Sequence, residues 1–592
     1  MKTMKDEKLL AEFPPVGAAE WQAAIARDLK GADPEKRLTW RTDEGMAVRP
    51  FYRAEDLKNL AWVDVVPGEF PYRRSARASG DWRIREEIEA ADAEAANRMA
   101  QGLVAAGAES IAFLEIPVKS AEQLEKLLAN LDAIPVHFAR ADERLIRMLI
   151  ERQSLKPRAH EISTGCDALA SLDFAAEIVR ALPSGFVPFA IHCEAFADTG
   201  ATAVEEIGFA LAAGVGFLAC LAERGAEIDR AAAALEFSFA IGSNYFFEIA
   251  KLRAFRMEWA RVVQSFAGAR LAAKARIAAR TSQWNKTVYD PHINILRATT
   301  EAMAAVLGGA DAVTVAPFDA CAKAPDEANR RLARNTQLLL KHEAWLGRVA
   351  DAGGGSYALE TITDFLAHEG WKAMQEIEAR GGFLKAQAEG TIAQALERSL
   401  KAREQAVATR KRVLVGTNQF ANPSERALDR IDEQRMKADL RGARMFEELR
   451  LRTERHAAAG GKMPQILLAE IGDVKMRAAR SNFAMNFFCC AGFHIVKRRF
   501  KKAEEIAAAD ADAIVLCSAD QEYAALAAEL VPKLKSLGRA TPVIVAGNPE
   551  NAEELRAAGI ADFVHLRSQP VEFLSKWQQR LGIEEQPLAS SC

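Results

Sequence analysis

The chain has 592 residues and a mass of 64.7 kDa, several times the length of a typical domain, so a single small binding module is excluded. Apolar residues make up 49% and charged residues 27%, which is typical of globular proteins and excludes disordered, collagenous and disulfide-scaffold classes. Lys and Arg total 78 against 81 Asp and Glu, a net charge of -3, so no overall basic field exists for nucleic acid or an anionic membrane surface.

The N-terminus and the cysteines indicate the compartment. Residues 1–12 are charged, and no uncharged apolar stretch of about 18 residues follows, which predicts a soluble, cytoplasmic protein. The cysteines show no CxxC or other ligand-like spacing, so we expect reduced, mostly buried thiols, without disulfides or a zinc site. They are residues 166, 193, 220, 321, 489, 490, 517 and 592.

Residues 1–63 mix polar and aromatic side chains without a lasting period, which predicts an extended N-terminal arm with one helix near 18–29. From residue 64 to 383, short apolar runs alternate with amphipathic helical segments. Such alternation gives parallel strands, and at this length the predicted fold is a closed (β/α)8 TIM barrel with any active site at the strands' C-terminal ends. The predicted strands are 110–118, 135–139, 186–193, 235–241, 275–279 and 311–317.

The rest of the chain divides into a linker and a second α/β region. Residues 384–462 are rich in Arg, Glu, Lys and Ala, which predicts a helical linker ending at Gly460-Gly461. Residues 463–592 alternate again, which predicts a doubly wound, flavodoxin-like domain that binds ligands, if any, at a topological switch point. Its predicted strands are 465–472, 493–497, 512–517, 542–546 and 562–566.

Several segments are specific enough to indicate a family. RTSQWNKTVYDPHINILRATTEAMAAVLGGADAV (280–313) and RRLARNTQLLLKHEAWLGRVADAGGGSYALE (330–360) closely resemble the methylmalonyl-CoA mutases, which are cobalamin-dependent carbon-skeleton mutases, as do 200–217 and 244–260. The resemblance runs from about Phe70 to the C-terminus. It implies a substrate-holding barrel, a linker and a cobalamin-binding-type domain. In such mutases the Co–C bond of adenosylcobalamin breaks homolytically, and the deoxyadenosyl radical removes hydrogen from acyl-CoA inside the barrel.

The family's cobalamin signature is degraded. The resemblance places Asp-x-His-x-x-Gly, whose His ligates cobalt, at Asp473 to Ala478, where Lys475 replaces the His and Ala478 the Gly. An ammonium has three donors and no lone pair, so Lys475 is not expected to ligate. The Ser-x-Leu and Gly-Gly elements correspond to Cys517-Ser518-Ala519 and Ala546-Gly547. We expect no cofactor-binding or metal-ligating residue in this chain.

The catalytic Tyr-His pair of the family is replaced as well. Alignment on Gly200-Ala201 places Glu194 and Ala195 at its two positions. His192 lies nearby, but strand residues alternate faces, so it is interpreted as a hydrogen-bonded strand histidine rather than a shifted catalyst. We therefore expect no catalytic residue.

The substrate contacts implied by the resemblance are also changed. The Thr-Met-Tyr loop is missing, because Arg74 to Trp82 spans too few residues before Trp82-Arg83-Ile84-Arg85. Polar family residues are replaced by Gly309, Asp311 and Thr314-Val315-Ala316, which predicts small or apolar groups where acyl-CoA would be contacted.

Four other features are interpreted as structural. Asp290-Pro291-His292 predicts a helix start capped by the Asp, and Gly353-Gly354-Gly355-Ser356 a tight turn rather than a phosphate cradle. Cys489-Cys490 is expected in the core without a redox role. The basic run 497–502 is expected to be a solvated connection between a strand and a helix rather than a phosphate site.

The sequence therefore favours the small, non-catalytic subunit of a heterodimeric methylmalonyl-CoA mutase. The resemblance implies a homologous large subunit that carries adenosylcobalamin and acyl-CoA and interconverts methylmalonyl-CoA and succinyl-CoA, and the aromatic arm is a candidate to wrap it. Two alternatives stay open. The chain is a catalytic acyl-CoA mutase with unusual cobalamin binding, or it is a stand-alone regulatory or chaperone-like protein.

Overall fold

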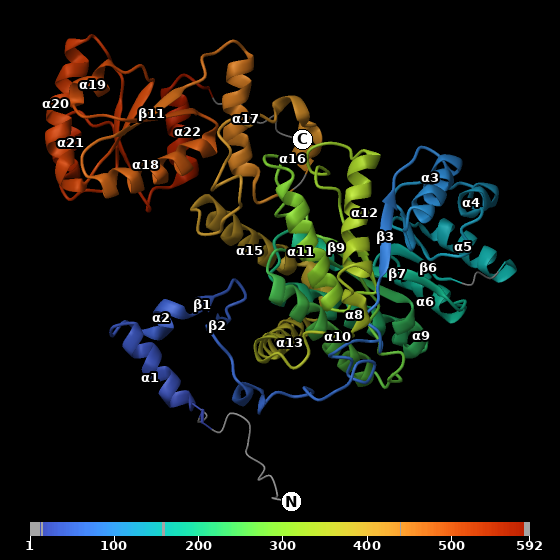
Figure 1. The fold of residues 1–592 in the computed structure, drawn as a ribbon. Coiled ribbons are helices and arrows are strands. Elements are labelled where there is room, and N and C mark those ends of the chain that lie inside the picture. Colours follow the sequence, from blue (N-terminus) through green and yellow to red (C-terminus); the bar gives the residue numbers. More distant parts are fainter. Residues whose placement is uncertain (1–11, 14–15, 157–159, 439, 585–592) are drawn as a thin grey trace, which may run out of the picture.

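The computed structural model describes residues 12–13, 16–156, 160–438 and 440–584. Figure 1 shows an arm (blue) that reaches away from a helix-covered barrel (light blue to yellow), and a second sheet (orange to red) on the other side of helix α17. The chain is an α/β protein with a closed parallel barrel and a separate parallel sheet.

The arm contains the predicted helix and more structure than expected. Helix α1 spans Ala18–Asp28, and it is followed by α2 (Pro34–Leu38), whose N-cap Asp33 accepts a hydrogen bond from the Glu35 N–H at 2.9 Å. A short antiparallel pair, β1 (Trp40–Arg41) and β2 (Ala47–Val48), and a 3-10 turn, η1 (Ala54–Leu57), complete it. The arm contacts the body where the Trp40 ring lies 5.9 Å from the Phe247 ring and where Asp43 pairs with Arg412.

The barrel closes in the order β10-β3-β4-β5-β6-β7-β8-β9, and all its strand pairs are parallel. This confirms the predicted barrel, although the strands labelled β3 and β6 were not predicted. Its strands are β3 Arg83–Ile88, β4 Ser110–Phe113, β5 Val136–Phe138, β6 Ile162–Asp167, β7 Phe186–His192, β8 Leu235–Ile241, β9 Ile277–Thr281 and β10 Ala312–Thr314.

Helices cover the outside of the barrel, and their apolar faces form one core with the outward side chains of the strands. They are α3 Ala93–Ala105, α4 Ala121–Leu128, α5 Glu143–Leu155, α6 Leu172–Arg180, α7 Cys193–Asp198, α8 Ala203–Glu223, α9 Ile228–Ala233, α10 Tyr245–Ser265, α11 Ile293–Leu307, α12 Glu327–His342 and α13 Tyr357–Glu378.

Helix α8 is the most apolar part of this layer. Among the described helices it is long and apolar enough to cross a membrane, but 67% of its apolar window is buried inside the protein. Gly214 of α8 lies against the Trp259 ring of α10, and Gly370 of α13 lies against Ile207 of α8, so small residues allow close helix packing. Helix α8 is thus a core helix of this fold.

The linker is helical at both ends and irregular between them. It contains α14 (Phe383–Ala388), α15 (Thr391–Ala408), the 3-10 turn η3 (Leu428–Arg430), α16 (Glu433–Ala438) and α17 (Arg444–Ala458). Buried carboxylates attach α17 to the loop after β9. Glu447 accepts a hydrogen bond from the Val288 N–H at 2.8 Å, and Glu454 accepts one from the Tyr289 hydroxyl at 2.8 Å. The linker therefore packs on the C-terminal side of the barrel.

The second sheet is parallel in the order β12-β11-β13-β14-β15, with helices on both faces. Its strands match the predicted runs: β11 Gln465–Glu470, β12 His494–Arg499, β13 Ala513–Cys517, β14 Val543–Ala546 and β15 Asp562–Val564. Its helices are α18 Val474–Phe488, α19 Ala503–Ala508, α20 Tyr523–Ser536, α21 Ala552–Ala557 and α22 Pro570–Arg580. The 3-10 turns η4 (Cys489–Ala491) and η5 (Asp520–Glu522) follow α18 and β13.

One local interpretation was wrong, and a second was incomplete. Asp290 does not cap a helix. It has a φ of 49°, and α11 begins at Ile293 after His292, with no side-chain cap. The basic run 497–502 is not only a connection, because Lys497–Arg499 belongs to edge strand β12, where Glu470 of β11 pairs with Lys497 at 3.1 Å and Arg499 at 3.2 Å.

Candidate functional site

The residues singled out in the sequence lie at two places, the mouth of the barrel and the C-terminal edge of the second sheet. At the mouth, His192 ends β7 and Glu194 lies in the first turn of α7. At the sheet edge, Asp473 and Lys475 begin α18 after β11, and Ser518 follows β13. In both places the C-terminal ends of parallel strands present their side chains, which is where α/β proteins place their ligand sites.

His192 and Glu194 form an ion pair in the barrel mouth. Nδ1 of His192 lies 2.9 Å from Glu194 Oε1, and Nε2 lies 3.0 Å from the Gly165 carbonyl oxygen. Both partners are acceptors, so the imidazole is doubly protonated, and the hydrogen bond to Glu194 raises the pKa of His192 to about 9. Ser238 of β8 donates to the other oxygen of Glu194. The interpretation of His192 as a hydrogen-bonded strand histidine agrees with this geometry.

Below this pair lies a second charged group. Arg85 of β3 donates to Glu236 of β8 at 3.1 Å, and His137 Nδ1 of β5 lies 2.9 Å from the Ser163 hydroxyl and 3.6 Å from Glu236. Despite desolvation, the charge of Arg85 holds the pKa of Glu236 at about 2. Burial lowers the pKa of His137 to about 4, so that ring is neutral at pH 7.

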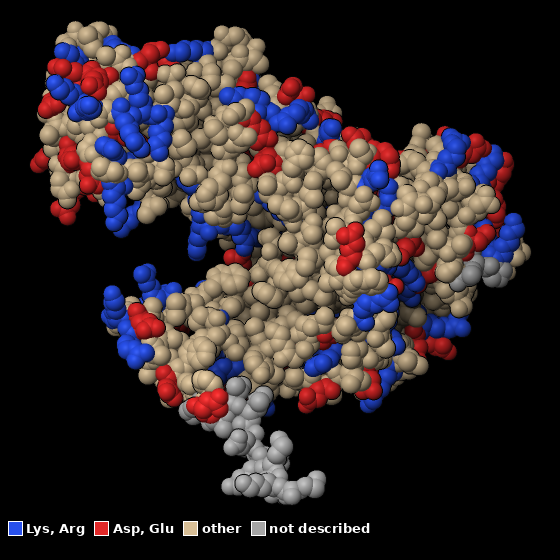
Figure 2. All heavy atoms as spheres, viewed as in Figure 1, with Lys and Arg blue, Asp and Glu red and all other residues tan. Residues whose placement is uncertain are grey.

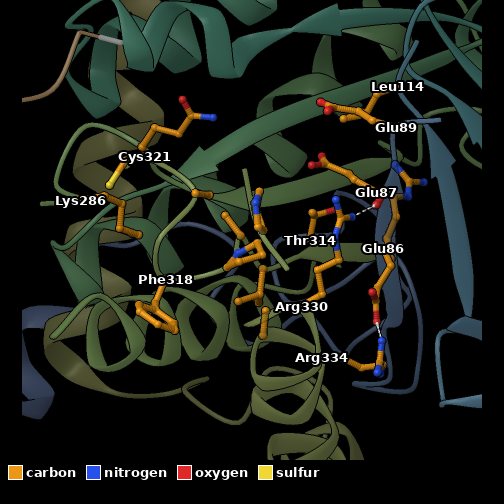
Figure 3. A pocket seen from close by; sticks show the side chains of 18 of the residues that line it. Glu86, Glu87, Glu89, Leu114, Lys286, Thr314, Phe318, Cys321, Arg330 and Arg334 are labelled. Atoms are coloured by element: carbon orange, nitrogen blue, oxygen red, sulfur yellow. Dashed lines mark hydrogen bonds and ion pairs between the residues drawn. The ribbon is translucent and has the colours of Figure 1, made fainter. Parts of the chain in front are cut away.

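Two adjoining cavities open above these groups. One has a volume of about 430 Å³ and is lined by the charged residues just described, and the other has a volume of about 600 Å³ and reaches the loop after β10. Figure 3 shows the larger one, with Glu87 of β3 and Glu89, which follows that strand, near the cavity and Glu86 of β3 reaching Arg334 of α12. The barrel mouth is therefore polar and hollow.

The expected small or apolar contacts are found only in part. Thr314, Val315 and Ala316 line the larger cavity and Thr314 also lines the smaller one, but Gly309 packs against Arg256 and Asp311 lies at the opposite end of the barrel. There the Asp311 carboxylate accepts a hydrogen bond from the Ile277 N–H at 2.8 Å and pairs with Arg77 at 3.3 Å.

At the second sheet, Asp473 acts as a helix cap. Its Oδ1 accepts a hydrogen bond from the Met476 N–H at 2.7 Å, so helix α18 already begins at Val474. Lys475 lies in the first turn and is exposed. The carboxylate of Asp473 is thus engaged by its own helix, and the position where the resemblance implies a His holds a cation.

The adjacent part of the sheet edge is filled by side chains. Glu522 accepts hydrogen bonds from the Asp473 N–H at 3.1 Å and from the hydroxyl of Ser518. The Tyr523 hydroxyl donates to the Ala546 carbonyl oxygen at 2.7 Å. A Cβ added at Gly472 would lie 2.1 Å from Glu522 Oε2. These residues close the space between β11, β13 and β14, and they do not fit a nucleotide tail or a cobalt ligand at this edge.

The remaining sequence candidates are structural. Cys489 and Cys490 are buried, and burial raises the pKa of their thiols to about 11 and about 12, as expected of core groups. Residues 353–356 form a turn in which the Gly355 N–H donates to Glu360 at 2.9 Å. Among the described residues, no group of three or more His, Cys, Asp or Glu side chains has the arrangement of a metal site.

Sequence reasoning missed the charged interior of the barrel. The side chains of Arg85 and Glu87 line it because they share one face of β3, and the alternation in RIREEI is the signal that could have identified them. The partner of Arg85 could not be read from β3 itself, since Glu236 lies 151 residues away.

A closed parallel barrel followed by a parallel sheet defines a two-part α/β protein, and comparisons with known proteins identify its family. A family model described as methylmalonyl-CoA mutase matches residues 41–120 and 171–480. The methylmalonyl-CoA mutase small subunit of Porphyromonas gingivalis is 38% identical over 98% of this chain and 99% of its own length. The small subunit of Streptomyces virginiae is 31% identical over 97% and 98%. The large subunit of Streptomyces virginiae is 28% identical over 77% of this chain and 69% of its own.

The chain therefore belongs to the methylmalonyl-CoA mutase family. The predicted resemblance is confirmed over nearly the whole chain.

Proposed function

We propose that this chain is the small, non-catalytic subunit of a methylmalonyl-CoA mutase heterodimer. Its partner is a homologous large subunit, which binds adenosylcobalamin and acyl-CoA, and the complex interconverts methylmalonyl-CoA and succinyl-CoA in the cytoplasm. The names of relatives that align over 97% or more of this chain support the subunit assignment. In this proposal, residues 1–63 are the arm, 64–383 the barrel, 384–462 the linker and 463–592 a degenerate, flavodoxin-like cobalamin-type domain.

The filled edge of the second sheet is the observation that supports the non-catalytic part of the proposal. Lys475 offers no lone pair while it is charged, Asp473 caps its own helix, and Glu522 occupies the space beside Gly472. The strand order β12-β11-β13-β14-β15 is the flavodoxin-like order, which supports a domain that keeps this fold without the ligand.

The barrel mouth supports the same proposal. In place of the family's Tyr-His pair, Glu194 is engaged by His192 and Ser238. A carboxylate held in this way accepts hydrogen bonds, whereas a tyrosine hydroxyl also donates one. This difference supports our assignment of acyl-CoA chemistry to the partner.

The N-terminal arm is our candidate for the contact with the partner. Its Trp21, Trp40 and Trp62 side chains are 46%, 52% and 47% exposed, which is unusual for aromatic residues. A groove of about 640 Å³ lies between α1, α2 and η1 and is lined partly by apolar side chains, including Ile25 and Phe51. Binding of a folded partner stabilises both chains by mass action, which gives a non-catalytic subunit a physical role.

The test is to express the full chain alone and together with the homologous large subunit, and to measure complex mass, bound cobalamin and mutase activity. We expect an inactive, cobalamin-free lone chain and an active complex. Deletion of residues 1–30 should weaken the complex while leaving the barrel folded. Activity or stoichiometric cobalamin in the lone chain would show a catalyst with unusual cobalamin binding. A stable complex with another protein but none with the large subunit would support a stand-alone regulatory role.

A further inference from the structure

A wide hollow separates the second sheet from the N-terminal arm. Figure 2 shows it as an open space on the left of the molecule, with Lys and Arg side chains on both of its walls. In Figure 1, α18 and α15 border this hollow on the side of the second sheet, and β1 and β2 of the arm border it on the other side. The arm, which we propose as a partner contact, is thus one wall of the hollow.

The opposite wall belongs to a strongly basic part of the chain. Residues 471–502, which follow β11 and contain α18 and β12, include eight Lys or Arg residues and one acidic residue, Asp473. The loop after α15 adds the cations of Arg410-Lys411-Arg412. We call the cations of 410–412 and 471–502 the basic face. Because the whole chain has a net charge of -3, this concentration of positive charge is local.

Contacts join the loop, the helix and the edge strand into one surface. The Arg410 guanidinium lies 5.9 Å from the ring centre of Phe487 in α18. Lys497 of β12 donates a hydrogen bond to the Asn482 side chain of α18 at 2.9 Å. Arg412 forms the ion pair with the arm that was described above. The basic face therefore continues from the second sheet to the arm.

Only part of the basic face is neutralised within the chain. Glu470 pairs with Lys497 and Arg499, and Asp520 pairs with Arg480. Exposed cations that lie close together repel one another, so an anionic partner would stabilise this surface. The exposed cations that have no carboxylate partner among the described residues are Lys411, Lys475, Arg498, Lys501 and Lys502.

Exposed apolar side chains lie beside these cations. Val413, Val415 and Phe420 of the loop after α15 are 44%, 43% and 59% exposed, and the Phe420 N–H donates to the Asn486 side chain of α18 at 3.1 Å. Charges that only protect an edge strand from pairing do not need such neighbours. Aromatic and apolar groups beside Arg are typical of protein interfaces, so this surface favours a protein partner over a phosphate polymer.

We propose that the large subunit fills this hollow, with an acidic surface against the basic face and apolar side chains against Val413, Val415 and Phe420. The arm contacts the same partner from the other side of the hollow. This inference rests on the proposed function, because it names the surface through which the proposed partner binds. It gives the second sheet a role in assembly.

The test measures the affinity of the full chain for the large subunit at a series of NaCl concentrations. We expect the affinity to fall as the salt concentration rises, because salt screens exposed charges. The double variant Lys411→Glu/Lys475→Glu should weaken binding at least about tenfold at low salt and reduce the salt dependence. Phe420→Ala should weaken binding at every salt concentration, since its contact is apolar.

The double variant Lys119→Glu/Lys535→Glu is the matched control. It makes the same change of charge at two exposed lysines, but Lys119 precedes α4 of the barrel layer, and Lys535 lies in α20, which packs on the opposite face of the second sheet from α18. It should leave the affinity and its salt dependence unchanged. Both double variants should keep the melting temperature of the wild-type chain, because none of the four lysines has a carboxylate partner among the described residues.

The outcomes separate this inference from the proposed function. Equal affinity of the wild type and Lys411→Glu/Lys475→Glu, or an equal loss of affinity in the control, would overturn the inference while the heterodimer stands. Failure of the wild-type chain to bind the large subunit at any salt concentration would overturn the proposed function as well. Self-association of the lone chain that Lys411→Glu/Lys475→Glu abolishes would assign the basic face to a second copy of this chain, which also contradicts the inference.

Discussion

The ion pair between His192 and Glu194 makes the stability of the barrel depend on pH. The pKa of His192 is raised from 6.5 to about 9, so its stabilising contribution is fully present below about pH 6.5 and is lost as the pH rises through about 9. We expect Glu194→Gln to lower the free energy of unfolding at pH 7 by about 1–2 kcal/mol, a value reduced for the partial exposure of His192.

Urea unfolding of both proteins at pH 7 and above pH 9 checks this. The difference between wild type and Glu194→Gln should shrink at the higher pH, where His192 is neutral in both. A constant difference would mean that Glu194 acts through Ser238 rather than through the charge of His192.

Restoring the family's histidine at position 475 tests whether this one replacement abolished the cobalamin site. We expect Lys475→His to gain no adenosylcobalamin, because Asp473 remains engaged by the Met476 N–H and Glu522 still fills the space beside Gly472. The visible absorbance of the protein after gel filtration with the cofactor measures this directly. Stoichiometric co-elution would contradict our view that the whole edge, rather than one residue, has lost the site.

At the scale of elements, the packing of α8 against α10 gives a paired test with two glycines of one helix. A Cβ at Gly214 would lie 2.4 Å from Cζ3 of Trp259, whereas the nearest atom at Gly216 is the Phe383 Cβ, 4.0 Å away. Gly214→Ala should therefore destabilise the protein by about 1–3 kcal/mol through overpacking.

Gly216→Ala has open space and should stabilise the helix by about 0.5–1 kcal/mol, since alanine loses less backbone entropy than glycine. Denaturation midpoints of the two variants should shift in opposite directions. Equal shifts would show that α8 can move away from α10.

The elements also show what the sequence could predict. Apolar runs identified β8 and β13 to within a residue, because a strand buried on its outer face needs such a run. Strands β3 and β6 escaped detection because their inward residues are charged or small, such as Arg85 and Gly165, and are satisfied by partners far away in the chain. The replaced motif residues were visible in the sequence, but the charged cavity of the barrel mouth was not, since it depends on how the strands close.

At the scale of the whole molecule, α17 couples the barrel to the second sheet. Glu447 is buried and accepts hydrogen bonds from the Val288 N–H at 2.8 Å and from Arg441 at 3.0 Å. Glu447→Ala removes the carboxylate of this buried ion pair, which should cost about 3–5 kcal/mol. We expect calorimetry to resolve separate unfolding transitions for the barrel and the second sheet in this variant.

Glu448→Ala is the matched control, because Glu448 pairs with Arg455 of the same helix at 3.0 Å. That pair does not reach the barrel, so the unfolding should stay as cooperative as in the wild type. If both variants split the transition, α17 itself rather than its contact with the barrel would hold the parts together.

The helices and turns of the arm bear on the rate and the entropy of its association with a partner. Its helices and turns are already formed, and Trp40 and Asp43 hold it against the body. A flexible tail would lose about 1–2 kcal/mol of conformational entropy for each residue ordered on binding. A prefolded arm would avoid most of this loss, so in the proposed complex the binding of the partner by the arm would be governed by diffusion and orientation rather than by folding.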